Sequence, residues 1–138
     1  MSFDFPVVDS HVHVWLADMP HIPNPRHRIG YAHPVEALLD QLDRHGVSHA
    51  CIAAASPYGD YNDYTIASVR GNPRLRGTVI LEPTVERYTL QAMARDGIVG
   101  VRLPYISLAE LPDLATFENQ RTLRRIRDLG DRKSTRLN

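Results

Sequence analysis

Four short apolar runs, each followed by a stretch with helical spacing, constrain the fold of this chain more than any other feature. The runs cover residues 7–15, 49–55, 77–82 and 98–103. Their nearly continuous apolar character is typical of strands that are buried in a parallel sheet. Regular alternation of such strands with helices favours an α/β fold.

The segments between the runs carry helix signals. In the first segment, Val35, Leu38 and Leu42 recur at helical spacing, and Gly46 stands where a C-terminal cap belongs. Asn62 is expected to cap a second helix through its side chain. Two more helices are expected, one between a cap at Thr84 and an end at Gly97, the other around Leu123 and Ile126.

A barrel fits this pattern better than a doubly wound sheet. No glycine-rich phosphate fingerprint follows the first run, and polar residues gather where the strands end, which is where barrel active sites lie. A complete barrel needs about 250 residues. With 138 residues, the chain is predicted to form the N-terminal half, about four βα units, of a (β/α)8 TIM barrel.

The first run also contains the strongest candidate for chemistry. His11 and His13 are two residues apart, so on a strand both point to the face that Asp9 shares. Two imidazoles on one face of an apolar strand are costly to bury without partners, and imidazole is the commonest metal ligand. A pair of core histidines bonded to the main chain is the simpler alternative. Asp9 is interpreted either as a carboxylate that orients one imidazole or as a structural hydrogen-bond acceptor.

Composition excludes several classes of function. The 16 basic and 16 acidic residues balance, so neither nucleic acid nor an anionic membrane surface is expected as a partner. The single cysteine, Cys51, rules out an internal disulfide and fits a reducing compartment. There is no apolar run long enough to span a membrane and no signal peptide. We therefore expect a cytoplasmic protein that acts on a small molecule.

The last eight residues differ in composition from the rest. Residues 1–130 contain thirteen arginines and no lysine, whereas the only lysine, Lys133, lies in 131–138. We predict that residues 1–130 are the partial barrel and that 131–138 are a non-native tail.

Several short motifs, in order along the chain, resemble the amidohydrolase superfamily, in particular its 2-pyrone-4,6-dicarboxylate lactonase branch. The resemblance covers residues 4–130. The matching pieces are Asp9-Ser10-His11-Val12-His13-Val14-Trp15, Ser56-Pro57-Tyr58-Gly59, Asn62, Arg76-Gly77 and Gly100-Val101-Arg102.

The resemblance implies a hydrolase of a lactone or ester in a small carboxylated substrate. It implies that His11 and His13 are catalytic, either as ligands of a divalent metal such as Zn or Mn or by metal-independent chemistry. It also implies that Arg102 binds a substrate carboxylate. Further substrate contacts are implied for Ser56, Tyr58 and Asn62. The histidine and aspartate that the family carries in the second half of its barrel have no counterpart in this sequence.

Other interpretations remain open at this point. Arg102 could instead pair with Glu82, and His21, His27 and His33 are expected to be solvated residues of a proline-rich loop. A metal-dependent decarboxylase of the same superfamily is an alternative function. A second alternative is an inactive fragment, whose open sheet edges would make the isolated chain self-associate.

Overall fold

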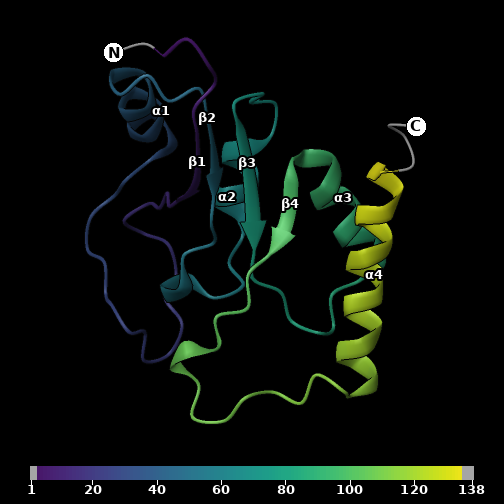
Figure 1. Cartoon of the computed structure of the whole chain (residues 1–138). Coiled ribbons are helices and arrows are strands. Elements are labelled where there is room, and N and C mark those ends of the chain that lie inside the picture. Colours follow the sequence, from purple (N-terminus) through teal and green to yellow (C-terminus); the bar gives the residue numbers. More distant parts are fainter. Residues whose placement is uncertain (1–2, 135–138) are drawn as a thin grey trace.

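The computed structural model describes residues 3–134, and their side chains except those of 107 and 131–134. Strands and helices alternate along the chain (Figure 1). The elements are β1 (Val8–Val12), α1 (Val35–Arg44), β2 (His49–Ile52), the 3-10 turn η1 (Ser56–Tyr58), α2 (Asp63–Val69), β3 (Leu75–Val79), α3 (Arg87–Asp96), β4 (Ile98–Val101), the 3-10 turn η2 (Tyr105–Ser107) and α4 (Phe117–Ser134).

The four strands form one parallel sheet in the order β1-β2-β3-β4. Each strand is therefore hydrogen-bonded to its neighbour in sequence, and every carboxyl end lies at the same edge of the sheet. This confirms the expected α/β fold. The arrangement is that of successive βα units of a (β/α)8 barrel.

The core lies between the outer face of the sheet and the helices. Ile52 and Leu75 are completely buried, and Leu38 of α1 and Val69 of α2 pack in the same cluster. Helix α2 lies behind the strands in Figure 1, while the face toward the viewer shows the strands themselves. The buried apolar residues of the strands thus pack against the helices.

Strand β1 is less buried than its sequence predicts. Val12 and Val14 face the core as expected, but Val8 is 60% exposed. The reason is position: β1 is an edge strand with β2 on one side only. The prediction of a strand buried throughout is wrong for its first half.

Two of the predicted helix ends are confirmed and one helix start is wrong. Gly46 and Gly97 follow α1 and α3 in left-handed conformations, with φ values of 66° and 110°. Thr84 does not cap α3, because it lies in a turn closed by a hydrogen bond from Val85 N–H to the Glu82 carbonyl. Helix α3 begins only at Arg87.

Helix α4 continues past the predicted boundary at residue 130 and reaches Ser134. Residues 135–138 of the proposed tail lie outside the described part of the chain. The non-native origin of 131–138 stays a prediction. Among the described helices, none is both long enough and apolar enough to cross a membrane.

Candidate functional site

Two consecutive alanines organise the carboxyl edge of the sheet. Ala53 and Ala54 follow β2 directly and are both buried. Ala53 donates its N–H to the Val12 carbonyl of β1 (2.7 Å), and Ala54 donates its N–H to the Thr78 hydroxyl of β3 (3.3 Å). Their carbonyl oxygens accept hydrogen bonds from two side chains, one from the β1 side of the sheet and one from the β4 side.

From the β1 side, the ring of His13 reaches Ala53. Nδ1 of His13 lies 2.7 Å from the Ala53 carbonyl oxygen. Because a carbonyl can only accept, Nδ1 carries the proton and Nε2 of the neutral ring keeps a free lone pair. The ring of His11 lies edge-on to the ring of His13, with 5.0 Å between their centroids. The two imidazoles therefore lie together, as their spacing predicts.

The surroundings of His13 favour its neutral form. Burial lowers the pKa of His13 below the usual 6.5, and the charges of His11 and Arg102 lower it further. The hydrogen bond to Ala53 opposes these effects in part. Near pH 7 the ring is thus an uncharged proton acceptor at Nε2.

From the β4 side, Arg102 reaches the neighbouring carbonyl. Its main-chain N–H bonds the Val79 carbonyl (2.8 Å), and its Nη1 donates to the carbonyl of Ala54 at 2.6 Å. Gly100 is two residues before Arg102, and a Cβ there would lie 3.3 Å from the Thr78 methyl group. Within the described residues no ion pair joins Arg102 to Glu82. The guanidinium keeps further donors free for a carboxylate.

Asp9 shares the histidine face but does not touch an imidazole in a described hydrogen bond. Its carboxylate accepts the main-chain N–H of His11 at 3.1 Å. This contact agrees with the interpretation of Asp9 as a structural hydrogen-bond acceptor.

Tyr58 and Ser56 lie in η1, just after the two alanines. Tyr58 is 3% exposed, and its hydroxyl has no hydrogen-bond partner among the described residues. Burial, with a smaller effect from Tyr31, raises the pKa of that hydroxyl. Ser56 is half-buried and accepts the N–H of Gly59 at its carbonyl. Substrate contacts by Tyr58 and Ser56 stay predictions.

Asn62 does not cap helix α2 through its side chain as predicted, but binds the main chain after β3. It precedes α2, but its side chain makes no cap hydrogen bond. Instead, the buried amide binds the main chain of Ile80 after β3. The predicted side-chain cap is wrong because this pairing satisfies the amide elsewhere. A substrate contact by Asn62 stays a prediction, since Ile80 already uses both its oxygen and its nitrogen.

Of the three loop histidines, His27 is exposed as expected, whereas His21 and His33 are half-buried and make packing contacts. Nε2 of His21 accepts the N–H of Ile29 (3.2 Å), and its ring lies 4.9 Å from that of Tyr58. His33 packs 5.2 Å from Trp15, and the main chains of these two residues form an antiparallel bridge. The loop sequence lacks the periodicity that would have predicted these contacts.

The described residues do not supply a complete metal site. A zinc site takes three or four protein ligands, and no group of three His, Cys, Asp or Glu side chains lies suitably placed in the described part of the chain. His11 and His13 provide at most two. A metal would need further ligands from outside these residues.

Sequence reasoning missed the alanine carbonyls. Main-chain oxygens carry no residue signature, and Ala53 and Ala54 read only as the end of an apolar run. The sequence shows only that small side chains follow the second apolar run.

Comparison with solved structures supports the fold. A protein from Acinetobacter baumannii, described as a probable 2-pyrone-4,6-dicarboxylic acid hydrolase with citric acid bound, is 29% identical over 91% of this chain and 47% of its own, with a TM-score of 0.85. A Pseudomonas putida protein is also provisionally described as a 2-pyrone-4,6-dicarboxylic acid hydrolase. It is 35% identical over 90% of this chain and 45% of its own, with a TM-score of 0.77.

A third structure, from Agrobacterium tumefaciens, shows the fold alone. It is 21% identical over 73% of this chain and 38% of its own, with a TM-score of 0.62. No family model matches the sequence. The chain spans less than half the length of these solved relatives. The expected partial barrel is thus confirmed, and the first two of these structures carry a description as a 2-pyrone-4,6-dicarboxylic acid hydrolase.

Proposed function

We propose that this chain is the first half of an amidohydrolase-type barrel that hydrolyses a lactone or ester in a small carboxylated molecule. The observation that carries the proposal is the convergence of His13 and Arg102 on consecutive carbonyls at the carboxyl edge of a parallel sheet. The 35% identity to a protein provisionally described as a 2-pyrone-4,6-dicarboxylic acid hydrolase supports it. The citric acid bound to the Acinetobacter protein supports a ligand with several carboxylates.

The two side chains have different parts in the proposed reaction. Arg102 docks a substrate carboxylate through the guanidinium donors that Ala54 does not use. Neutral His13, held by Ala53, accepts a proton at Nε2 from the attacking water, as a general base. This assignment differs from direct polarisation of the substrate carbonyl by His13, because a neutral ring with its proton on Nδ1 has no donor at Nε2.

A divalent metal such as Zn or Mn remains part of the proposal only as an addition from the rest of a longer barrel. Nε2 of His13 and the ring of His11 would be two of its ligands, and His13 would then not be the general base, because its one free lone pair would bind the metal. When bound, such a metal would lower the pKa of a bound water. The described residues alone do not hold it.

A chimera tests the proposed activity. Residues 4–130 of this chain would replace the matching segment of the Pseudomonas putida protein, and hydrolysis of 2-pyrone-4,6-dicarboxylate would be followed by ultraviolet absorbance. The unmodified Pseudomonas protein is the control for the assay, and circular dichroism shows whether the chimera folds.

The proposal expects a folded chimera with hydrolase activity that falls by about 100-fold or more with Arg102→Met or His13→Asn. A folded chimera that does not hydrolyse the lactone contradicts the proposed reaction. Release of carbon dioxide in place of ring opening would favour the decarboxylase alternative.

A further inference from the structure

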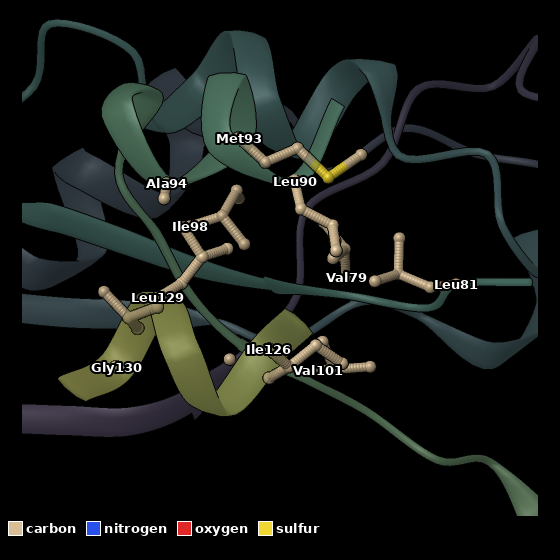
Figure 2. Close-up of a pocket in the computed structure, with 12 residues that line it drawn as sticks. Val79, Leu81, Leu90, Met93, Ala94, Ile98, Val101, Ile126, Leu129 and Gly130 are labelled. Carbon is tan, nitrogen blue, oxygen red and sulfur yellow. The ribbon is translucent and has the colours of Figure 1, made fainter. Parts of the chain in front are cut away.

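Strand β3 carries a hydroxyl on the face of the sheet that holds His13 and Arg102. Val79 and Val101 face the helices, because both line an apolar cavity between the sheet and helices α3 and α4 (Figure 2). Neighbouring residues of a strand point to opposite faces. Thr78 and Arg102, which adjoin these two valines in the sequence, therefore face away from the helices.

The Thr78 hydroxyl is bound to the peptide group that also binds His13. Ala54 donates its main-chain N–H to Oγ1 of Thr78 at 3.3 Å, and the ring of His13 donates to the carbonyl of Ala53 at 2.7 Å. This N–H and this carbonyl are the two ends of one peptide group. Thr78 and His13 are thus joined through a single peptide, and Arg102 bonds the next carbonyl along the chain.

The Thr78 hydroxyl is free to donate. A hydroxyl has one proton to donate besides its lone pairs, and among the described residues Oγ1 of Thr78 makes one hydrogen bond, as the acceptor from Ala54. Thr78 is the only hydroxyl side chain in β2, β3 and β4, and it is half-buried. Its partner in β4 is Gly100, where a Cβ would lie 3.3 Å from the Thr78 methyl group. The absence of a side chain at Gly100 therefore leaves room beside Thr78.

The proposed hydrolysis needs a donor of this kind. Neutral His13 carries its proton on Nδ1, so its Nε2 accepts a proton from water and donates none to the substrate. Arg102 is assigned to a substrate carboxylate. The carbonyl oxygen, which becomes negatively charged during the reaction, needs another hydrogen-bond donor. Donors placed at such an oxygen are usually the largest single contribution to catalysis of acyl transfer.

We propose that Thr78 is a catalytic residue whose hydroxyl donates a hydrogen bond to the carbonyl oxygen of the substrate. The inference rests on the proposed function, with His13 as the general base. In the first step the water oxygen bonds the carbonyl carbon, one water proton moves to Nε2 of His13, and the electron pair of the carbonyl π bond moves to the oxygen that Thr78 binds. In the second step this pair re-forms the carbonyl, the ester C–O bond breaks, and the departing oxygen takes the proton from His13.

The shared peptide couples the base to the donor. When His13 takes up the proton, its ring is charged and donates more strongly to the carbonyl of Ala53. Hydrogen bonds in a chain polarise one another, so the N–H of Ala54 and the hydroxyl of Thr78 become stronger donors in turn. Donation by Thr78 is therefore strongest when the carbonyl oxygen carries its charge.

Three substitutions in the chimera described above test the proposal. Thr78→Val keeps the shape of the side chain and removes the hydroxyl, whereas Thr78→Ser keeps the hydroxyl. Thr65→Val is the matched control, because Thr65 is a buried threonine of α2 whose methyl group faces Gly77 from the helix side. We expect Thr78→Val to lower kcat about 100-fold with KM changed by less than about twofold. Thr78→Ser should retain most of the activity, and Thr65→Val should match the parent.

Citrate titration of the full 138-residue chain tests the same hydroxyl without the reaction. Citrate is the ligand of the Acinetobacter protein, and a carboxylate oxygen takes the place of the charged carbonyl oxygen. Calorimetry should show a citrate dissociation constant that Thr78→Val raises about tenfold, and that Thr78→Ser and Thr65→Val leave unchanged. Circular dichroism shows that each variant is folded. If Thr78→Val does not fold, Thr78→Cys replaces it, because a thiol still accepts the Ala54 N–H but is a weaker donor.

Several results would overturn the proposal. They are a folded Thr78→Val chimera with the kcat of Thr65→Val, a rise in KM with unchanged kcat, and a folded Thr78→Ser chimera as slow as Thr78→Val. A folded chimera without activity contradicts the proposed function, and the citrate titration then decides the inference alone, as it does if the chimera does not fold. In that case a loss of affinity confined to Thr78→Val supports a hydroxyl that binds a ligand oxygen. Equal affinities of Thr78→Val and Thr65→Val, or no citrate binding, would overturn it.

Discussion

The side-chain amide of Asn62 is hydrogen-bonded twice to the main chain of Ile80. Nδ2 donates to the Ile80 carbonyl at 2.8 Å, and Oδ1 accepts the Ile80 N–H at 3.2 Å. Both groups are buried, and the contact joins the start of α2 to the end of β3. It therefore fixes the loop that carries η1 relative to the carboxyl edge of the sheet.

Replacing this amide should destabilise the fold. In Asn62→Ala, the Ile80 N–H and carbonyl lose their partner in a buried position, and we expect a loss of about 2 kcal/mol in the free energy of unfolding. Urea denaturation measures it. Asn119→Ala is the control, because the Asn119 amide bonds the Asp113 carbonyl in an exposed position. Equal losses in the two variants would contradict the structural role of Asn62.

The free energy of unfolding should decrease as the pH is lowered, in part because of His13. Burial, the main cause, lowers the pKa of His13 in the folded chain below its usual 6.5. As pH falls through about 6.5, the unfolded chain binds this proton first, so the free energy of unfolding decreases. Above that pH His13 is neutral in both the folded and the unfolded chain, so it causes no such loss of stability. Denaturation of wild type and His13→Asn at about pH 7.5 and about pH 5 should show a smaller decrease in the variant. An unchanged decrease would refute the assignment.

The charge of Arg102 should be detectable in the titration of His13. After burial and the charge of His11, Arg102 is a further cause of the lowered pKa of His13. Arg102→Met removes that charge, so the pKa of His13 should rise in an NMR titration of the imidazole protons. Arg76→Met is the control, because Arg76 is an exposed arginine of β3 whose described hydrogen bonds go to Pro73 and Leu75. A rise of equal size in the control would contradict the proximity argument.

Arg74 should matter for stability far more than most arginines of the chain. Its guanidinium donates to the carbonyls of Ser48 (2.9 Å) and Val47 (3.0 Å) and pairs with Asp43 (2.8 Å). Arg74→Met should cost about 1–3 kcal/mol of unfolding free energy, because it leaves the two carbonyls without this partner. Arg44→Met, which breaks only an exposed pair with Asp40, should cost below about 0.5 kcal/mol. Chemical denaturation separates the two.

Gly59 should not tolerate a side chain. It has a φ of 56°, and a Cβ there would lie 2.5 Å from the Ile22 Cγ2 atom. Gly59→Ala should therefore destabilise the chain by about 1–2 kcal/mol. Gly30→Ala is the control, since a Cβ at Gly30 meets nothing within 4 Å. In Gly59→Ala/Ile22→Ala, relief of the clash should recover part of the loss, and a full recovery would show that backbone strain is negligible.

Much of the fold could be predicted from the sequence because apolar runs and glycine positions are local signals. Gly46 and Gly97 end helices where expected, and the strands alternate with helices in the predicted order. The low burial of Val8 could not be predicted, because it depends on the number of neighbours that β1 has in the sheet.

The candidate site was predictable only in part. The spacing of His11 and His13 predicts their shared face, and the structure places their rings together. The hydrogen bonds that orient His13 and Arg102 go to main-chain oxygens of Ala53 and Ala54, 40 and 48 residues away along the chain. Such long-range contacts to carbonyls depend on the tertiary structure and leave no mark in the residue types.

The reach of Arg102 across β3 has a mechanical consequence. By bonding Ala54 with one of its nitrogens, this side chain braces the ends of two strands that are not neighbours. Any anion that the guanidinium binds with its remaining donors is held by a group that the bond to Ala54 already restrains. Capture of such an anion would therefore cost little side-chain entropy, and it would stiffen the rim of the sheet at the same time.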